Sequence, residues 1–405
     1  MKLLVLTYGT EGDTRPLTML CRGLLDAGHR VQLLAEAGTL DSARDQCVPH
    51  AALEGDIQQD VVSLVSRGNR LTAAARGLAR MARRHVPAWM RQADAAASGC
   101  DAVLSGGLAA FVGLAVAERH GLPAVGAGMI PLSPTRRFAS PFLPPLPLPG
   151  ALKRLSYPLV NRVVWAQFRG SVDPVRRSWG LPPQTARWPG MPMLYGISPC
   201  LLPRPPDWPA NHVVCGQWRA PDSSGWRPSP ALQAFLQAGE PPVYIGFGSM
   251  TGFDRNAVLG ALLQALAGRR VLLFPGWSGR PSLPLPGNVH VIGPTPHEAL
   301  FPLTAAVVHH GGSGTTHSAC RAGVPSLVMP FAADQFFWAR RLQALGVAPA
   351  PLSSRRLDPR RLAAALAFAS HPATRARAAA LAGAMAGEDG VGNGVAALER
   401  WLLAG

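Results

Sequence analysis

Short apolar runs alternate with amphipathic stretches along the first half of the chain. The run "KLLVLT" predicts a buried strand, and apolar residues at helical spacing over Leu17–Ala27 predict the helix that follows it. A glycine then ends this helix and opens "GHRVQLLAE", which predicts a second strand. Further strands are predicted at Asp101–Gly107 and Leu122–Met129, with a helix over Ala109–His120 between them. This alternation indicates βαβ units and therefore a parallel sheet.

The same rhythm returns after residue 226. The predicted elements are a strand in "PVYIGFGSM", a helix over Asn256–Ala267, strands in "RVLLFPGW" and "NVHVIGP", a strand over Ala305–Val308, a helix over Thr315–Ala322, a strand over Ser326–Met329 and a helix over Phe336–Leu345. Two copies of one rhythm predict an α/β protein with two Rossmann-like, doubly wound domains that face each other across a cleft.

Changes in composition suggest where these domains end. Residues 201–226 are rich in proline and turn residues, so we predict a linker there. The N-terminal domain then covers residues 1–200 and the C-terminal domain residues 227–387. A last helix in residues 388–405 follows the complete second domain, and no predicted strand follows it. We therefore expect it to return to the first domain.

Composition places the chain among globular proteins. It has 405 residues, of which 48% are hydrophobic and 15% charged, enough for a large core in two domains. The longest weakly polar run, Ala102–Ala117, is too short to span a bilayer, and "MKLLVLTYGT" lacks the long apolar core of a signal peptide. The six cysteines are scattered without metal-site spacing, which is typical of reduced thiols. We therefore expect a cytoplasmic protein.

The formal net charge of +16 comes from 39 basic and 23 acidic residues. No basic groove with interleaved aromatics and no known binding motif accompanies this charge, so we expect no nucleic-acid partner. The densest basic segment is a predicted helix around Arg76–Arg91, whose arginines lie on one arc, opposite Leu78, Met81, Val86 and Trp89. One interpretation is a helix packed on the sheet with a solvated basic face. The other is a peripheral contact with the inner membrane surface.

The stretch that organises the second half is Ala305–Gln335. It contains a His- and Gly-rich turn, His309–Gly314, between a predicted strand and a predicted helix. Such a turn leaves backbone N–H groups unpaired at the positive end of the helix dipole, which suits a phosphate group. The sequence therefore predicts a nucleoside-diphosphate site here. The first strand-to-helix loop, Gly9–Arg15, lacks GxGxxG, so a dinucleotide is not expected.

A proline-rich, irregular insertion covers Pro131–Pro149. A long insertion at the strand-end side of a sheet is more often a binding loop than a core element. We assign it to an acceptor pocket that includes Phe138 and Phe142, and the apolar residues around them favour an apolar acceptor. The alternative is a simple surface excursion.

Five motifs occur in order at suitable spacing: "GTEGDTRPL", "LYGISPCLLPRPPDW", "PTPHEALFP", "HHGGSGTTHSACRAGVPSLVMPF" and "DQFFWARRLQALGV". Together they resemble the two-Rossmann-domain (GT-B) glycosyltransferases that use nucleotide sugars. The sequence is most similar to the bacterial and fungal sterol 3-beta-glucosyltransferase branch, with glycopeptide and macrolide glycosyltransferases as near relatives. The resemblance covers Lys2 to about Gly346.

This resemblance implies an enzyme that moves a hexose from a nucleoside-diphosphate sugar to a hydroxyl of an apolar small molecule, such as a sterol, a polyketide or another lipid-like alcohol. Transfer is expected to invert the anomeric carbon. The nucleotide sugar is a co-substrate, and neither a cofactor nor an essential metal is expected.

In the first domain the resemblance places Asp13 at the position of the proposed general base. A carboxylate that takes the proton of the acceptor hydroxyl contributes roughly 10²- to 10⁴-fold to the rate. The alternative role for Asp13 is the N-cap of a helix that starts near Pro16.

In the second domain the resemblance assigns donor binding to Gly248, Ser249, Trp277, His297, His310, Gly312, Ser313, Gly314, Thr315, Asp334 and Gln335. His310 corresponds to the histidine that contacts the donor phosphate, and the turn that follows it would surround the diphosphate. The pair Asp334-Gln335 matches the acid-amide pair that hydrogen-bonds donor-sugar hydroxyls. His309 is interpreted as a packing residue at the strand end.

The remaining donor residues have less specific roles. Gly248 and Ser249 would face the same diphosphate, whereas Trp277 and His297 occupy positions at which relatives hold the nucleobase. Trp277 equally suits a core. Plant relatives have a ribose-binding glutamate where this chain has Ser318. A UDP-sugar is favoured by the resemblance to the sterol branch, and a dTDP-sugar is the alternative.

Two other functions fit the same motifs. One is an epimerase of this fold that acts on the nucleotide sugar itself. The other is an auxiliary protein that has the glycosyltransferase fold without the chemistry. Retention of Asp13, His310 and the pair Asp334-Gln335 favours the enzyme that transfers a sugar.

Overall fold

The computed structural model describes residues 1–56, 58–60, 71–184, 191–220, 225–251, 253–353 and 357–403. The chain divides into two compact units. The first contains Met1–Arg219 together with Asp389–Gly405, and the second contains Ala220–Glu388. Each unit is built on its own sheet.

The described residues of the first unit form a seven-stranded sheet in the order β3-β2-β1-β4-β5-β6-β7. Its strands are β1 (Lys2–Tyr8), β2 (Arg30–Glu36), β3 (His50–Leu53), β4 (Ala102–Gly107), β5 (Ala124–Gly128), β6 (Met193–Tyr195) and β7 (His212–Val214). All neighbouring pairs are parallel. The central strand β1 is a continuous apolar run with Leu3 to Leu6 fully buried, as expected for a strand covered on both faces.

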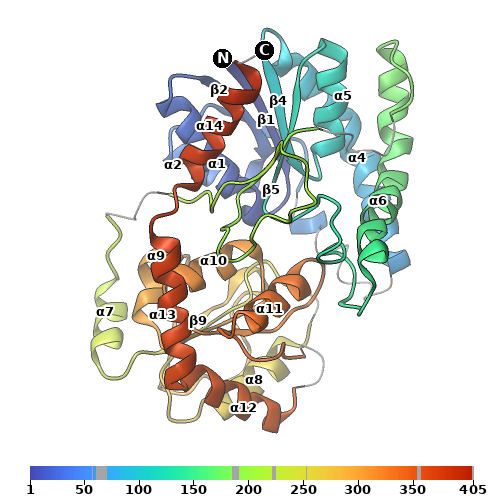
Figure 1. Cartoon of the computed structure of the whole chain (residues 1–405). Coiled ribbons are helices and arrows are strands. Elements are labelled where there is room, and N and C mark those ends of the chain that lie inside the picture. The colour runs from blue at the N-terminus through green and yellow to red at the C-terminus, as the bar shows by residue number, and fades with distance from the viewer. Residues whose placement is uncertain are drawn as a thin grey trace. The chain divides into compact units, whose positions relative to one another are not determined.

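Helices surround this sheet. They are α1 (Glu11–Asp26), α2 (Asp41–Asp45), α4 (Leu71–Ala97), α5 (Ala110–His120), α6 (Gly150–Ser178) and α14 (Gly390–Leu402). Helices α4 and α6 lie side by side along one edge of the unit, and α14 packs against α1 (Figure 1). Because the helices follow strands and cover the sheet, this is the doubly wound α/β arrangement.

The second unit has a five-stranded parallel sheet in its described residues, in the order β10-β9-β8-β11-β12. The strands are β8 (Val243–Gly246), β9 (Val271–Phe274), β10 (Val289–Val291), β11 (Ala306–His309) and β12 (Ser326–Val328). The helices are α7 (Pro230–Gln237), α8 (Arg255–Ala265), α9 (His297–Leu300), α10 (Ser313–Arg321), α11 (Gln335–Ala344), α12 (Pro359–Ser370) and α13 (Pro372–Ala386). The predicted α/β class with two Rossmann-like units is confirmed.

The predicted linker at 201–226 differs from the structure. Residues up to Arg219 belong to the first unit, and β7 continues its sheet. Prolines interrupt this stretch, but Trp208 is buried between them. The guanidinium of Arg204 donates hydrogen bonds to the carbonyls of Trp208, Pro209 and His212. The segment therefore folds with the unit rather than linking it, and residues 221–224 lie outside the described residues.

The C-terminal segment belongs to the first unit. The side chain of Asn393 in α14 donates to the carbonyl of Cys215 at 2.9 Å, and Glu399 lies 3.0 Å from the ring of His29. A β-carbon on Gly23 of α1 would come 2.2 Å from Val391, so the two helices meet at a glycine. Among the described residues, no helix is both long and apolar enough to cross a bilayer.

Candidate functional site

The start of α10 is an open helix terminus. Gly312 occupies the N-cap position, and it has no side chain that could cap the N–H groups of the first turn. Gly311, directly before it, has φ of 91°, and a β-carbon there would lie 2.8 Å from Val328. Only glycine fits this turn. The backbone N–H groups of Ser313, Gly314 and Thr315 are therefore presented by β11 and the turn as an anion site.

His310 lies between two glycines at this terminus. A β-carbon on Gly312 would come 2.5 Å from its Nε2, and one on Gly248 would come 3.2 Å from its Cε1. Its Nδ1 is buried without a hydrogen-bond partner among the described residues. Burial, followed by the charge of His297, lowers the pKa of His310 to about 4. The ring is thus neutral near pH 7 and offers one N–H donor and one acceptor nitrogen.

The turn that contains Gly276 and Trp277 packs against Gly248, the neighbour of His310. The backbone N–H of Trp277 donates to the carbonyl of Gly248 at 3.1 Å. Gly276 has φ of 58°, and a β-carbon there would lie 2.2 Å from that carbonyl oxygen. The Trp277 turn, Gly248 and His310 are therefore neighbours, and Ser249 follows Gly248 directly. Trp277 is half-buried, so it belongs to this turn and is not a core residue.

His297, a predicted donor residue, and His309, a predicted packing residue, have different surroundings from His310. His297 begins α9 and stacks on Phe301, with ring centroids 4.3 Å apart. His309 is fully buried in β11, and its Nδ1 accepts a hydrogen bond from the N–H of Gly311. Burial lowers the pKa of His309 well below its usual range. His309 therefore shapes the turn from inside, as a packing residue.

The loop before α11 positions the acid-amide pair. Oε1 of Gln335 accepts hydrogen bonds from the N–H groups of Phe331 (2.7 Å) and Ala332 (3.1 Å), and its Nε2 donates to the sulfur of Met250. Ala333 sits in the left-handed region with φ of 52°, which is uncommon for a residue with a β-carbon. In this structure the Gln335 amide holds the loop, so its predicted bond to a sugar hydroxyl requires a change of partners.

A contact chain links Asp334 to the open helix terminus. Oδ2 of Asp334 accepts a hydrogen bond from Nε1 of Trp338, whose ring meets His317 edge-on at 5.3 Å. Nδ1 of His317 donates to the carbonyl of Ser313 at 2.7 Å. His317 was not predicted. The i, i+4 spacing of Ser313 and His317 on one helix face was the available signal.

A carboxylate that the sequence reasoning missed lies beside Ser318. The hydroxyl of Ser318 donates to Oε1 of Glu298 at 3.4 Å, which joins α10 to α9. Ser318 is the position at which the resemblance to plant relatives implies a ribose-binding glutamate. The structure thus brings an acidic group to this place from the "PTPHEALFP" motif. The sequence pattern does not indicate that Glu298 contacts Ser318, because the two residues are 20 positions apart and lie on different helices.

In the first unit, Asp13 occupies the third position of α1. The helix starts at Glu11 rather than near Pro16, and Thr10 is its N-cap. The Asp13 carboxylate accepts a hydrogen bond from the N–H of Thr10 at 2.9 Å and lies over Gly9, where a β-carbon would come 2.2 Å from Oδ2. Burial raises the pKa of Asp13 to about 6, against the hydrogen bonds from Thr10. Asp13 closes a capping box, and its raised pKa suits a base as well.

The predicted acceptor residues lie in the insertion between β5 and α6. The carbonyl of Phe138 accepts a hydrogen bond from the hydroxyl of Tyr157, and Phe142 is 39% exposed. Asp207 holds the same insertion through the hydroxyl of Thr135 and the N–H of Arg136. The insertion contains no helix or strand in its described residues, yet it is fixed to the unit at both points.

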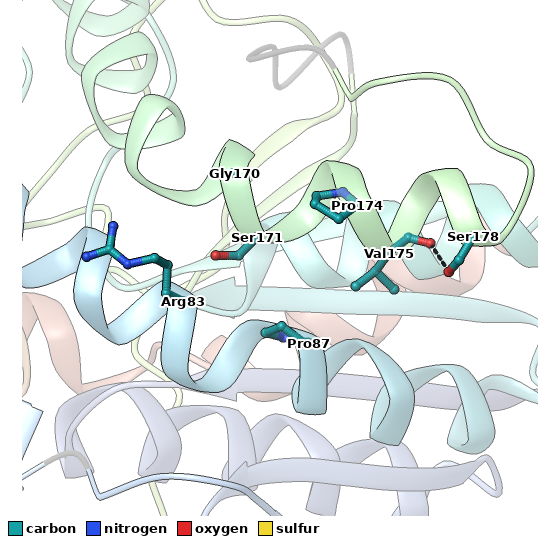
Figure 2. Close-up of a pocket in the computed structure, with 7 residues that line it drawn as sticks. All are labelled: Arg83, Pro87, Gly170, Ser171, Pro174, Val175 and Ser178. Atoms are coloured by element: carbon teal, nitrogen blue, oxygen red, sulfur yellow. Dashed lines mark hydrogen bonds between the residues drawn. The ribbon is translucent and has the colours of Figure 1, made fainter.

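A cavity of about 470 Å³ lies between α4 and α6, and its lining contains none of the predicted catalytic, donor or acceptor residues. Figure 2 shows Pro87 on one helix and Pro174 on the other, with Gly170 and Ser171 beside them. Glycine and serine leave this space open because their side chains are small. Proline adds no long side chain and also lacks a backbone N–H. It brings together no group that can take part in sugar transfer, so we do not assign it to the site.

Comparison with known proteins identifies the family. A family model described as erythromycin biosynthesis protein CIII-like, C-terminal domain, matches residues 260–397. The chain is 34% identical over 428 residues to the O-mycaminosyltylonolide 6-deoxyallosyltransferase of Streptomyces fradiae, covering 99% of this chain and 97% of that protein. It is 32% identical over 422 residues to a sterol 3-beta-glucosyltransferase of Aspergillus fumigatus, covering 99% of this chain.

The chain spans only 30% of the length of that sterol enzyme. Among solved structures, a spinosyn rhamnosyltransferase in complex with thymidine diphosphate has a TM-score of 0.67 and 21% identity, with 100% of both chains covered. This likeness shows the shared fold. The chain belongs to the family of GT-B glycosyltransferases that includes the Streptomyces fradiae 6-deoxyallosyltransferase.

Proposed function

We propose that this chain is an inverting glycosyltransferase that moves a hexose from a nucleoside-diphosphate sugar to a hydroxyl of an apolar small molecule. The observation that carries the proposal is the open terminus of α10. There, the N–H groups of the first turn and the ring of His310, whose buried Nδ1 has no partner in the described part of the chain, meet at one point. These are the groups that a diphosphate needs.

The second unit stabilises the leaving group in this proposal. Departure of the nucleoside diphosphate places negative charge on its terminal phosphate. The N–H groups from Ser313 to Thr315 and an N–H of neutral His310 would then strengthen their hydrogen bonds to it. Asp334 and Gln335 would hold the sugar hydroxyls, with Gln335 exchanging its loop contacts for the sugar.

The first unit supplies the base. Asp13 takes the proton of the acceptor hydroxyl as its oxygen forms a bond to the anomeric carbon and the bond to the diphosphate oxygen breaks. A conjugate-acid pKa of about 6 makes Asp13 a stronger base than an ordinary aspartate, yet ionised near pH 7. Attack from the face opposite the leaving group inverts the anomeric carbon.

Neither a cofactor nor a metal is required in this proposal, because the helix terminus and His310 offset the charge of the diphosphate. For the donor we favour a UDP-sugar, with a dTDP-sugar as the alternative. Glu298, beside Ser318, provides an acidic acceptor in the region predicted for the nucleoside. The complex of the rhamnosyltransferase with thymidine diphosphate supports including both nucleotides in the test.

For the acceptor we propose an apolar alcohol of sterol or macrolide type that meets Phe138 and Phe142. The names of the two relatives support this class. The test is a mass-spectrometric screen that pairs UDP-glucose and dTDP-glucose with sterol and macrolide acceptors. A hexose added to an alcohol supports the proposal. Formation of an epimer from the nucleotide sugar alone, or no product with any pair, contradicts it.

We also propose a peripheral contact with an anionic membrane surface at the edge formed by α4 and α6. Arg76, Arg80, Arg83, Arg84 and Arg91 of α4 are exposed. The apolar side of α4 is buried, with Met81, Val86 and Trp89 less than 4% exposed. A helix packed on the unit with a solvated basic face is therefore enough to explain the exposed arginines and the buried apolar side of α4.

Apolar contact with a bilayer would come from the neighbouring helix. Leu152, Leu155, Leu159 and Val163 of α6 are 49%, 60%, 61% and 52% exposed and follow one another along one face. Lys153, Arg154, Arg162 and Arg169 accompany them on the same helix, and no acidic residue occurs between Gly150 and Val172. Exposed leucines beside cations are typical of a helix that lies on an anionic membrane.

A further inference from the structure

A small acidic cavity lies where β3 of the first unit ends. Its volume is about 230 Å³, and its lining includes Glu54, Asp56, Gln59, Asp60, Arg84 and His85. Three carboxylates thus face one guanidinium. This is unusual in a chain with 39 basic and only 23 acidic residues, because a random patch of its surface would be basic.

The negative charge extends beyond the lining. Burial, the hydrogen bond to Asp60 and the charges of Asp60, Glu36 and Asp56 all raise the pKa of the Tyr8 hydroxyl. Burial raises the pKa of the Glu36 carboxyl, and the charges of Asp56 and Asp60 add to this effect. The carboxylates of Glu36, Asp56 and Asp60 therefore act together near the ends of β1, β2 and β3, which favours a cation in the cavity.

A buried histidine with an unsatisfied nitrogen is directed into the same space. His85 is 3% exposed, and its Nδ1 has no hydrogen-bond partner among the described residues. That nitrogen lies 3.9 Å from Oε1 of Glu54, and Nε2 lies 3.5 Å from Oδ2 of Asp60. A buried polar atom without a partner is destabilising, so a donor from a ligand would be stabilising here.

The ring of His85 is held in place by its neighbours. It stacks on Trp89 with an interplanar angle of 10°, and Nε1 of Trp89 donates to the carbonyl of Glu54 at 2.6 Å. The hydroxyl of Tyr8 donates to Oδ2 of Asp60 at 2.8 Å. The His85 ring and the Asp60 carboxylate are therefore positioned before any ligand arrives.

A lining residue of the cavity, Gly55, contacts Tyr8, the residue that precedes the loop carrying Asp13. Tyr8 ends β1, and a β-carbon on Gly55 would come 2.3 Å from its hydroxyl oxygen. The next residue, Gly9, lies directly under the Asp13 carboxylate. Because β1, β2 and β3 are parallel neighbours, the cavity after β3 and the Asp13 loop after β1 follow the carboxyl ends of strands at the same edge of the sheet, where ligands of this fold class bind.

The acceptor atoms suit an ammonium group better than a metal ion. Carboxylates and an imidazole nitrogen all accept N–H donors, and an ammonium presents three of them. No group of three or more His, Cys, Asp or Glu side chains in the described ranges is arranged to hold a metal ion. We propose that this cavity binds the alkylammonium group of the acceptor, so that the enzyme selects apolar alcohols that also carry an amine. This inference rests on the proposed transferase function.

The test is a ligand-observed NMR titration of the whole chain with n-hexylammonium chloride and with 1-hexanol at physiological salt, where surface charges act over only about 8 Å. We expect the ammonium to bind about tenfold more tightly than the alcohol. The double variant Glu54→Gln/Asp56→Asn should remove this preference. Both side chains are exposed, so the fold should be unaffected. The matched control Asp26→Asn/Glu240→Gln removes the same charge from exposed sites elsewhere and should keep the preference.

Three results would overturn the inference: equal affinity for the ammonium and the alcohol, a preference that survives in the Glu54→Gln/Asp56→Asn variant, or displacement of the ammonium by micromolar MgCl2. Sugar transfer is not part of this measurement. Failure here therefore leaves the proposed function standing, whereas failure of every donor and acceptor pair would contradict that function without changing the titration.

Discussion

His310 lies against Gly312 so closely that a β-carbon on Gly312 would come 2.5 Å from Nε2. The φ of Gly312 is −64°, so alanine would be tolerated by the backbone but not by the histidine ring. We predict that Gly312→Ala displaces the ring and weakens UDP binding at least about tenfold, or about 1.4 kcal/mol. Calorimetric titration with UDP measures this.

The matched control for this prediction is Gly383→Ala in α13. A β-carbon there has no neighbour within 4 Å, so the change should leave UDP binding unaltered and stabilise the helix by roughly 0.5–1 kcal/mol. Wild-type UDP affinity in Gly312→Ala would show that the position of the His310 ring does not matter for the diphosphate.

The pH dependence of transfer should report Asp13. A base acts only when ionised, so protonation of Asp13 below its pKa of about 6 removes activity. We predict that kcat/KM falls about tenfold per pH unit below pH 6. His310 is not the source of this limb, because burial and the charge of His297 keep its pKa near 4.

The substitution Asp13→Asn separates the two roles of this residue. Its amide oxygen can still accept the N–H of Thr10, so the capping box and the melting temperature should be nearly preserved. Transfer should fall by roughly 10²- to 10⁴-fold while UDP binding remains. Asp26→Asn, at the other end of α1, is the control. Normal turnover in Asp13→Asn would remove Asp13 from the mechanism.

The fold was predictable because parallel strands are continuous apolar runs with a glycine-ended helix between them. The error at 201–226 arose because prolines were interpreted as a linker, whereas Arg204 satisfies the carbonyls around them. The predicted start of α1 near Pro16 is too late, because the helix begins at Glu11 and contains Pro16 in its interior. The spacing of Thr10 and Asp13, a capping box, was the better signal.

The chemistry of the site was less predictable than its position. Local sequence showed the turn around His310, but the use of the Gln335 amide depends on Met250, 85 residues earlier. The carboxylate beside Ser318 likewise comes from another helix, at Glu298. Such contacts depend on how side chains meet in space, which a pattern along one chain does not contain.

Replacement of Gln335 should affect the loop first. In Gln335→Ala the N–H groups of Phe331 and Ala332 lose their acceptor, which should cost about 1–3 kcal/mol of stability. Because the loop also positions Asp334, the KM for the nucleotide sugar should rise. Chemical denaturation and donor kinetics measure the two effects. Gln343→Ala, in the last turn of α11, serves as the control. An unchanged unfolding free energy would show that the loop does not need this amide.

Metal removal should leave transfer intact. The N–H groups at the start of α10 and the neutral His310 offset the charge of the departing diphosphate without an ion. We predict equal initial rates before and after treatment with EDTA, measured with the best donor and acceptor pair from the screen. Activity that disappears with EDTA and returns with MgCl2 would contradict this.

Binding to vesicles should depend on α6. Burying each exposed leucine stabilises the bound state by up to about 1.5–3 kcal/mol, and each nearby cation adds about 1 kcal/mol on an anionic surface. We predict that the chain floats with vesicles of phosphatidylcholine containing about 30% phosphatidylserine, and that Leu155→Asp/Leu159→Asp lowers the bound fraction at least about tenfold. Leu403→Asp is the control, because Leu403 is 61% exposed on another helix end. Equal binding of the double variant, or equal binding to vesicles of pure phosphatidylcholine, would show that this face does not recognise an anionic membrane.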